Sequence, residues 1–208
     1  MKLKPGVVSL FRSARFFVLA LLGMLYVVSH SQVLVQAADD VLQGVVRVKG
    51  RPQKDVVVWL ESGLPVPATD RRKIVLDQRN LQFSPRVLAI SVGTQVEMPN
   101  SDRVFHNVFS FHDGKRFDLG LYPVGTAKVV TFDKPGLSRI FCNIHPTMAA
   151  YVLAVDSGYF AVSDARGQFS IARVPQGSYT YHAWRPGDET TTGKVTVQAG
   201  ARLEIDWP

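Results

Sequence analysis

The chain has 208 residues, of which 46% are hydrophobic and 20% are charged. This composition fits one or two globular domains and excludes wholesale disorder and collagen-like repeats. The formal net charge is +7, but residues 1–37 hold four basic residues and no acidic one, which leaves 20 Lys and Arg against 17 Asp and Glu. That excess is too small to indicate a nucleic-acid partner. The single cysteine excludes an intrachain disulfide.

Residues 1–37 have the three-part layout of a secretory signal peptide. Basic residues precede an apolar run of 13 residues, Phe16–Val28, and a more polar stretch ends at Ala37 with small or modest side chains. Because the run is shorter than the ~20 residues that span a bilayer, we expect cleavage after Ala37 and a periplasmic protein. The alternative is an uncleaved leader, which would then provide the only membrane contact. In an oxidising compartment the lone thiol of Cys142 needs an occupant.

Strand patterns dominate after residue 40, and nowhere there do apolar residues keep a helical period over three turns. Residues 62–73 contain two prolines and three basic residues, which suits a linker. Short strands punctuated by Gly and Pro predict an all-β sandwich or barrel. The expected strands lie at 41–48, 56–60, 81–83, 88–92, 96–98, 129–132, 137–141, 151–155, 169–171, 179–184, 194–197 and 202–205.

The segment Cys142–Met148 carries the chemistry of the chain. It follows a predicted strand that ends at Phe141 and precedes one that begins near Ala149, so we expect a short loop. The loop offers a thiolate, the imidazole of His145 and a thioether. A second imidazole, His106, lies 36 residues before the cysteine, after a Pro99-Asn100 break.

Copper suits this donor set better than zinc. Cys thiolate and Met thioether favour Cu(I), whereas imidazole suits both oxidation states, and two His with one Cys and a distant Met define a blue-copper centre. Zinc prefers four strong ligands of the Cys, His or carboxylate type. Each residue also has an ordinary structural explanation, since a lone buried Cys or Met is usually core and a lone loop His is usually solvated.

Residues 79–156 resemble a cupredoxin of the plastocyanin–amicyanin–azurin group. The Cys142-x-x-His145-x-x-Met148 spacing matches the shortest ligand loops of that group and is most similar to amicyanin, while the segment from Phe83 to Val108 resembles the strand pair that delivers the first histidine. The resemblance implies one type 1 copper, with His106, Cys142 and His145 as equatorial ligands and Met148 as the axial one.

The same resemblance implies roles for residues around the ligands. Asn107 is expected to hydrogen-bond to the cysteine loop near Asn143, and Pro146 to keep that loop stiff. Electrons are expected to enter through His145 within an apolar patch. The family suggests a cytochrome or an amine-oxidising enzyme as the periplasmic redox partner, as for exported copper proteins of the methylamine-utilisation type.

A second resemblance covers the two ends of the mature chain. The motifs Asp164-x-x-Gly167-x-Phe169 and Pro175-x-Gly177-x-Tyr179 are similar to those of the carboxypeptidase-regulatory-like (transthyretin-like) β-sandwich. We therefore expect a small sandwich from 38–61 plus 157–208, a linker at 62–78, and a cupredoxin-like domain at 79–156 inserted in it or packed against it. The alternative is one continuous β assembly.

The sequence thus predicts an exported electron carrier that is not an enzyme. The alternatives are a copper storage or delivery module, and an adhesion or assembly module with a vestigial metal site. A catalytic copper cluster would need a His-Cys-His run and further histidines, but Asn143 follows Cys142 and only His112 and His182 are spare.

Overall fold

The computed structural model describes residues 40–61, 63, 73–111, 113–187 and 190–207. Within these residues the regular structure is entirely β, with 18 strands in five sheets, so the all-β expectation is confirmed. The predicted signal peptide lies outside the described residues. In the part of the chain that is described, no helix is long and apolar enough to cross a membrane.

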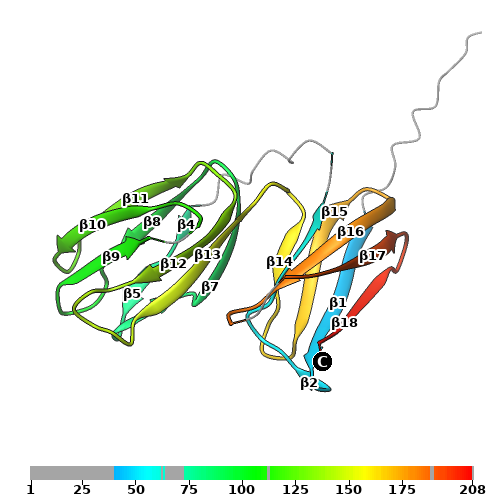
Figure 1. Ribbon diagram of the computed structural model, residues 1–208, viewed down its shortest axis with the longest axis horizontal. Helices are drawn as coiled ribbons and strands as arrows, with labels where there is room; N and C mark the ends of the chain where they lie inside the picture. The colour runs from blue at the N-terminus through cyan, green and yellow to red at the C-terminus, as the bar shows by residue number, and fades with distance from the viewer. Residues whose placement is uncertain (1–39, 62, 64–72, 112, 188–189, 208) are drawn as a thin grey trace, which may run out of the picture. The chain divides into compact units, whose positions relative to one another are not determined.

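The strands are short and follow one another closely along the chain (Figure 1). Their bounds are β1 Asp40–Val48, β2 Arg51–Pro52, β3 Val57–Glu61, β4 Ile74–Val75, β5 Asp77–Arg79, β6 Gln82–Ser84, β7 Val87–Ser91, β8 Thr94–Pro99, β9 His106–Ser110, β10 Phe117–Tyr122, β11 Ala127–Phe132, β12 Gly136–Phe141, β13 Ala149–Val155, β14 Phe160–Val162, β15 Gln168–Val174, β16 Gly177–Trp184, β17 Thr191–Val197 and β18 Arg202–Trp207.

The two ends of the described chain form one β-sandwich. Its first sheet has the order β15-β1-β18, with β2 paired to β1, and its second sheet has the order β14-β3-β16-β17. Alternate residues of both sheets turn inward, so Leu42 and Ile171 of the first sheet share a buried core with Leu60 and Val197 of the second. β15 and β18 therefore bury alternate residues, whereas β3 and β16 also bury residues on their second face, such as Val57 and Trp184.

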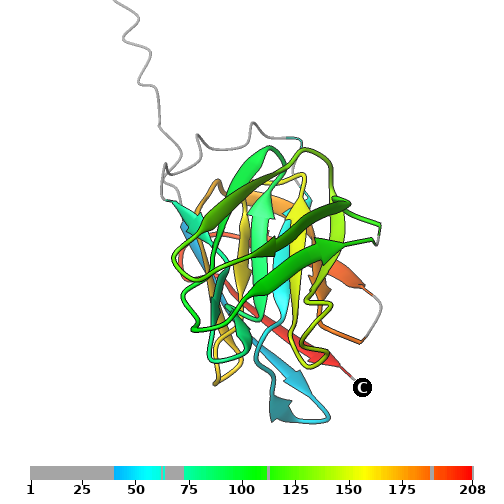
Figure 2. The ribbon, with the colours of Figure 1, turned by 90° about the vertical axis from the view of Figure 1, so that its left-hand side faces the viewer.

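The middle of the chain forms a second sandwich, drawn mostly in green in Figures 1 and 2. A five-stranded sheet of order β10-β9-β12-β13-β7 faces a three-stranded sheet of order β11-β8-β4 across a shared core. Val108 and Ile140 come from the first sheet, and Met98 and Phe132 from the second. A separate hairpin pairs β5 with β6.

The second sandwich is an insertion in the first. The strand before it, β3, and the strand after it, β14, pair antiparallel with each other, with Trp59 opposite Phe160. The chain thus leaves one sheet and returns to the neighbouring position in the same sheet. A further buried cluster combines Val57 and Trp184 with Val87 and Leu153, so apolar side chains of both sandwiches pack together.

Two of the segments that differ from the sequence expectation lie before β7. Residues 74–78, the end of the predicted linker, contain β4 and the start of β5, because Ile74 and Val75 pair parallel with β8 and Asp77 and Gln78 pair with β6. Leu81, expected to alternate with Phe83 in a strand, is instead 46% exposed in the turn between β5 and β6. Asn80 and Leu81 have φ of 53° and 57°, and positive φ at both central residues is the mark of a two-residue hairpin turn.

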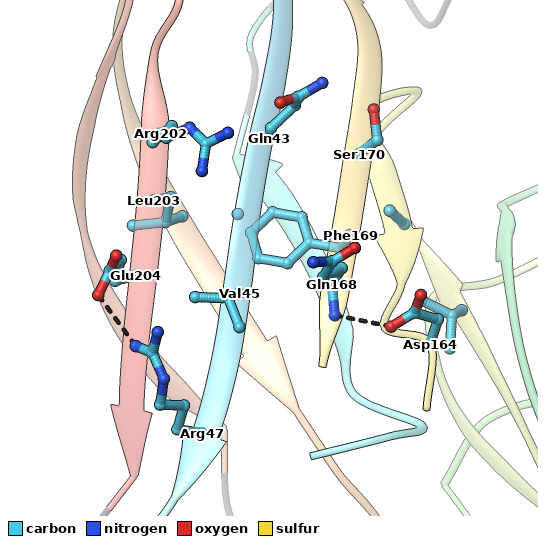
Figure 3. Close-up of a pocket in the computed structure, with 13 residues that line it drawn as sticks. Gln43, Val45, Arg47, Asp164, Gln168, Phe169, Ser170, Arg202, Leu203 and Glu204 are labelled. Atoms are coloured by element: carbon cyan, nitrogen blue, oxygen red, sulfur yellow. Dashed lines mark hydrogen bonds and ion pairs between the residues drawn. The ribbon is translucent and has the colours of Figure 1, made fainter. Parts of the chain in front are cut away.

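Gly44 in β1 provides a test of how the first sandwich is packed. A Cβ built there would lie 2.3 Å from the backbone oxygen of Leu203 and 2.3 Å from Cζ of Phe169, whose ring lies against β1 in Figure 3. We expect Gly44→Ala to lower the free energy of unfolding by about 1–3 kcal/mol through overpacking, measured by urea denaturation. Gly63→Ala is the matched control, since nothing lies within 4 Å of a Cβ there. Equal effects of the two substitutions would contradict the packing argument.

Candidate metal centre

The loop Cys142–Met148 joins two neighbouring strands of the five-stranded sheet. β12 ends at Phe141 and β13 begins at Ala149, which confirms the predicted strand–loop–strand boundary. The backbone N–H of Met148 donates to the carbonyl of His145 at 2.9 Å and closes a turn inside the loop. The thiol and the thioether at the two ends are 4% and 1% exposed, whereas Asn143, Ile144, Pro146 and Thr147 between them are exposed.

Sheet pairing brings His106 to this loop. His106 is the first residue of β9, and β9 pairs antiparallel with β12 through Phe109 and Phe141, the residue before the cysteine. The imidazole of His106 is completely buried. A side chain 36 residues away in sequence is thereby placed beside the thiol.

Three donor atoms converge at this point. The Sγ of Cys142 lies 3.8 Å from Nδ1 of His106 and 3.6 Å from Nδ1 of His145, and the two Nδ1 atoms lie 3.0 Å apart. The rings meet edge to face with centroids 4.8 Å apart. Both imidazoles therefore turn the same nitrogen, Nδ1, toward the thiol. Among the described residues these three form the one group of three or more His, Cys, Asp or Glu close enough to share a metal ion.

The residues present fit a metal ion of the copper type. A point equidistant from three atoms separated by 3.8, 3.6 and 3.0 Å lies about 2.0 Å from each, which is close to the ~2.0–2.3 Å of metal–nitrogen and metal–sulfur bonds. One thiolate and two imidazoles are the trigonal donor set of blue-copper sites. Cys142 is a free, buried cysteine, so its sulfur is not held in a disulfide. Met148 lies in the same buried cluster as Cys142.

An acidic residue contacts the far side of the His106 ring. Its Nε2 lies 3.1 Å from Oδ2 of Asp102, whose side chain is 13% exposed. The hydrogen bond from the backbone N–H of Leu81 is the main influence that lowers the pKa of the Asp102 carboxyl, with help from Arg103 N–H and His106, against the opposing effect of burial. The sequence alone does not indicate a function for Asp102, because its contact with His106 depends on the folded path of the loop between β8 and β9.

Of the residues expected to support the ligands, Asn107 has a side-chain partner outside the cysteine loop. The Nδ2 of Asn107 donates to Oδ1 of Asp118 at 2.7 Å, rather than reaching the loop near Asn143. The Oδ1 of Asn107 is buried and has no hydrogen-bond partner among the described residues. Asn143 and Pro146 are both exposed, so the loop presents them to solvent.

His182, a further histidine of the described residues, does not belong to the cluster. His182, in β16, stacks on Trp59 with ring centroids 5.0 Å apart, and its Nε2 lies 3.4 Å from a carboxylate oxygen of Glu61. His112 lies outside the described residues.

A separate groove of about 550 Å³ lies on the sandwich formed by the chain ends (Figure 3). Its charged lining residues include Arg47, Asp164, Arg202 and Glu204. Arg47 pairs with Glu204 at 2.9 Å, and an oxygen of Asp164 accepts from the backbone N–H of Gln168 at 2.8 Å. The groove is lined by neither histidine nor cysteine, and the His106–Cys142–His145 cluster found among the described residues lies in the other sandwich.

Comparison with known proteins gives partial matches. A family model described as "Polysaccharide lyase family 4, domain II" matches residues 153–205, which is less than half of the chain and does not establish membership. No curated protein matches the chain in sequence.

Solved structures similar to this chain include cupredoxins. A purple cupredoxin from Nitrosopumilus maritimus is 25% identical over 40% of this chain and 100% of its own, with a TM-score of 0.37. Amicyanin from Paracoccus versutus is 23% identical over 50% of this chain and 100% of its own, with a TM-score of 0.37. A copper-containing nitrite reductase from Thermus scotoductus is 25% identical over 47% of this chain but only 25% of its own, with a TM-score of 0.39. Scores of this size do not establish a function, which rests on the side chains themselves.

A buried tyrosine beneath the site allows a test of the surrounding polar network. The hydroxyl of Tyr122 donates to the carbonyl of Met98 at 3.0 Å and accepts from Nε2 of Gln78 at 2.5 Å. Burial raises the pKa of Tyr122 from 10.0 to about 12. Since the folded state keeps this proton longer than the unfolded state does, the stability contributed by the neutral phenol is complete below pH 10 and is lost as the pH rises toward 12.

We expect Tyr122→Phe to remove this pH dependence. The variant should be less stable at pH 8 by about 1–3 kcal/mol, because the amide of Gln78 and the carbonyl of Met98 each lose a hydrogen bond to the phenol. Between pH 8 and pH 11 the unsubstituted protein should lose about 1 kcal/mol more than the variant, measured by denaturant unfolding at both pH values. Parallel pH profiles would show that the phenol of Tyr122 is not the titrating group.

Proposed function

We propose that this protein binds one type 1 copper ion and carries single electrons between redox proteins of the periplasm, without catalysing a reaction itself. His106, Cys142 and His145 would hold the ion, with Met148 as a weak axial ligand. The observation that carries this proposal is the convergence of a buried thiol and two Nδ1 atoms on one point.

The chemistry of the donors favours copper over other metals. When bound, copper supplies a one-electron couple between Cu(I) and Cu(II), and the mixed sulfur and nitrogen donors stabilise both states. Cys142 and His106 are buried in the core of a closed sandwich, so little rearrangement of the protein accompanies a change of charge. Burial also keeps water from the thiolate, which protects it from oxidation.

The surface beside the ligands suits contact with another protein. His145 is half-buried, and its neighbour Ile144 is 47% exposed. Val104 and Phe105, which precede His106, are 43% and 52% exposed. Exposed apolar side chains of this kind mark contact surfaces for partners. A cytochrome or an amine-oxidising enzyme is the proposed partner, and export by residues 1–37 is part of the same proposal.

The visible spectrum tests the ligand set directly. We expect the Cu(II) protein to show an intense thiolate-to-copper charge-transfer band that bleaches on reduction, and Cys142→Ser to abolish that band. His182→Gln is the matched control, because this histidine contacts Trp59 and Glu61 rather than the thiol, and the variant should keep the band. A colourless protein with stoichiometric zinc, or a band that survives in Cys142→Ser, would contradict the proposal.

The rate of copper exchange separates an electron carrier from a copper storage or delivery module. An electron carrier should retain copper in the presence of a chelator and exchange electrons rapidly with a small redox reagent. A delivery module should release copper readily and react slowly. Stopped-flow measurements on the Cu(II) protein give both rates.

Replacing the proposed axial ligand should change the reduction potential. We expect Met148→Leu to retain copper and raise the potential, because the weak thioether donor to Cu(II) is lost. Met98→Leu is the control, since Met98 is equally buried in the same core but lies in β8 rather than in the ligand loop. Voltammetry of both variants gives the potentials. A lower potential in Met148→Leu would contradict the axial assignment.

A further inference from the structure

Both ring nitrogens of His106 have neighbours within the site. Its Nδ1 faces the thiol of Cys142 and the ring of His145, while its Nε2 lies 3.1 Å from Oδ2 of Asp102. A carboxylate can only accept a hydrogen bond, so this contact requires the proton of the neutral ring to sit on Nε2. The lone pair on Nδ1 is then free for a metal ion.

The Asp102 carboxylate is itself held in place by the backbone. Its Oδ2 also accepts from the N–H of Leu81 at 2.7 Å, and its Oδ1 accepts from the N–H of Arg103 at 2.9 Å. Both oxygens are therefore engaged. The Leu81 N–H is available because Leu81 sits in the tight turn between β5 and β6 rather than in a strand.

A buried asparagine anchors the loop that carries Asp102. The Oδ1 of Asn100 accepts from the N–H of Asp102 at 3.0 Å, while its Nδ2 donates to the carbonyls of Val104 and Tyr122 at 2.8 and 3.2 Å. Asn100 is completely buried. The loop from 101 to 105 thus has a defined path, and the carboxylate cannot turn away from His106 without breaking several hydrogen bonds.

We propose that Asp102 is a positioning residue of the metal centre, which fixes His106 with Nδ1 as its ligand atom and lowers the reduction potential of the bound ion. This proposal rests on the copper site proposed above. A carboxylate behind a ligating imidazole raises the basicity of the ring and fixes its orientation. The Asp102 side chain is only 13% exposed, so solvent screens its negative charge poorly. A negative charge behind the ligating ring favours Cu(II) over Cu(I).

The test is the reduction potential of Asp102→Asn in the copper-loaded protein. The amide oxygen of Asn can still accept from His106 and Leu81, so the variant removes the charge and retains the shape, although its NH2 group cannot accept from the N–H of Arg103. We expect the ratio of Cu(II) affinity to Cu(I) affinity to fall about tenfold, which raises the potential of a one-electron couple by about 59 mV. The charge-transfer band should remain.

Asp133→Asn is the matched control for the loss of one negative charge. Asp133 is 59% exposed in the turn between β11 and β12 and pairs with Lys115 at 2.9 Å. Its substitution should leave the potential unchanged. A shift of the same size in both variants, or no shift in Asp102→Asn, would overturn the role of Asp102.

Further variants separate charge from folding. Asp102→Glu keeps the charge, so its reduction potential should be closer to that of the unsubstituted protein than the potential of Asp102→Asn is. An equal rise in both variants would overturn the charge argument.

Asp102→Ala removes the hydrogen-bond acceptor as well as the charge, and we expect its copper affinity to fall by about 10- to 100-fold. If Asp102→Asn does not fold, Asp102→Ser, whose hydroxyl can still accept from Leu81, should show the same rise in potential, and no rise would overturn the proposal.

The two proposals fail in different ways. If the unsubstituted protein lacks the charge-transfer band, the copper site is wrong and the role of Asp102 falls with it. If the band is present and the potential does not respond to Asp102, only the positioning role is wrong.

Discussion

The candidate metal centre depends on one pairing between strands, that of β9 with β12. Its register places Phe109 opposite Phe141, so that the start of β9 lies beside the end of β12. His106 is the first residue of β9, and Cys142 directly follows the last residue of β12. Without this pairing the loop from Cys142 to Met148 would keep its own donors, but the second imidazole, 36 residues away in sequence, would have no fixed place. Because folding of the sandwich already brings these distant segments together, metal binding does not have to overcome the entropic cost of closing the loop between them.

Burial makes this arrangement rigid and also demands a polar network beneath it. His106, Gln78, Asn100 and Tyr122 are nearly or completely buried, and each would destabilise the core if its polar atoms lacked partners. Most of their polar atoms are satisfied by one another or by backbone carbonyls, as in the bonds from Gln78 and Asn100 to Tyr122. The network ends at Asp102, which connects it to the Nε2 of His106. The orientation of the ligand ring is therefore coupled to the folding of the segment from β5 to β10.

Local sequence patterns predicted the strands and the ligand loop because both are short-range features. Alternating apolar residues identify β12 and β13, and three donor types within seven residues identify the loop between them. β10 is not among the expected strands, since Asp118 and Gly120 interrupt its alternation and the register of its pairing with β9 shifts between Asp118 and Leu121. The Asp102 contacts could not be predicted from the sequence either. They join Leu81 to Asp102 across 21 residues, through a turn whose two positive φ angles involve Asn and Leu rather than glycine.

The insertion of one sandwich in the other has a consequence for the metal site. β13 begins next to Met148 and ends at Val155, after which the chain continues to β14 in the first sandwich, called here the outer sandwich because the second is inserted in it. A strand of seven residues spans about 20 Å, so the ligand loop and the connection lie at opposite ends of β13. Leu153 and Val155, at the connecting end, are the residues of β13 buried with Val57 and Trp184 of the outer sandwich. The described part of the outer sandwich contributes no residue to the His106–Cys142–His145 cluster. The buried contacts of Leu153 and Val155 therefore lie toward the end of β13 that is remote from the ligand loop.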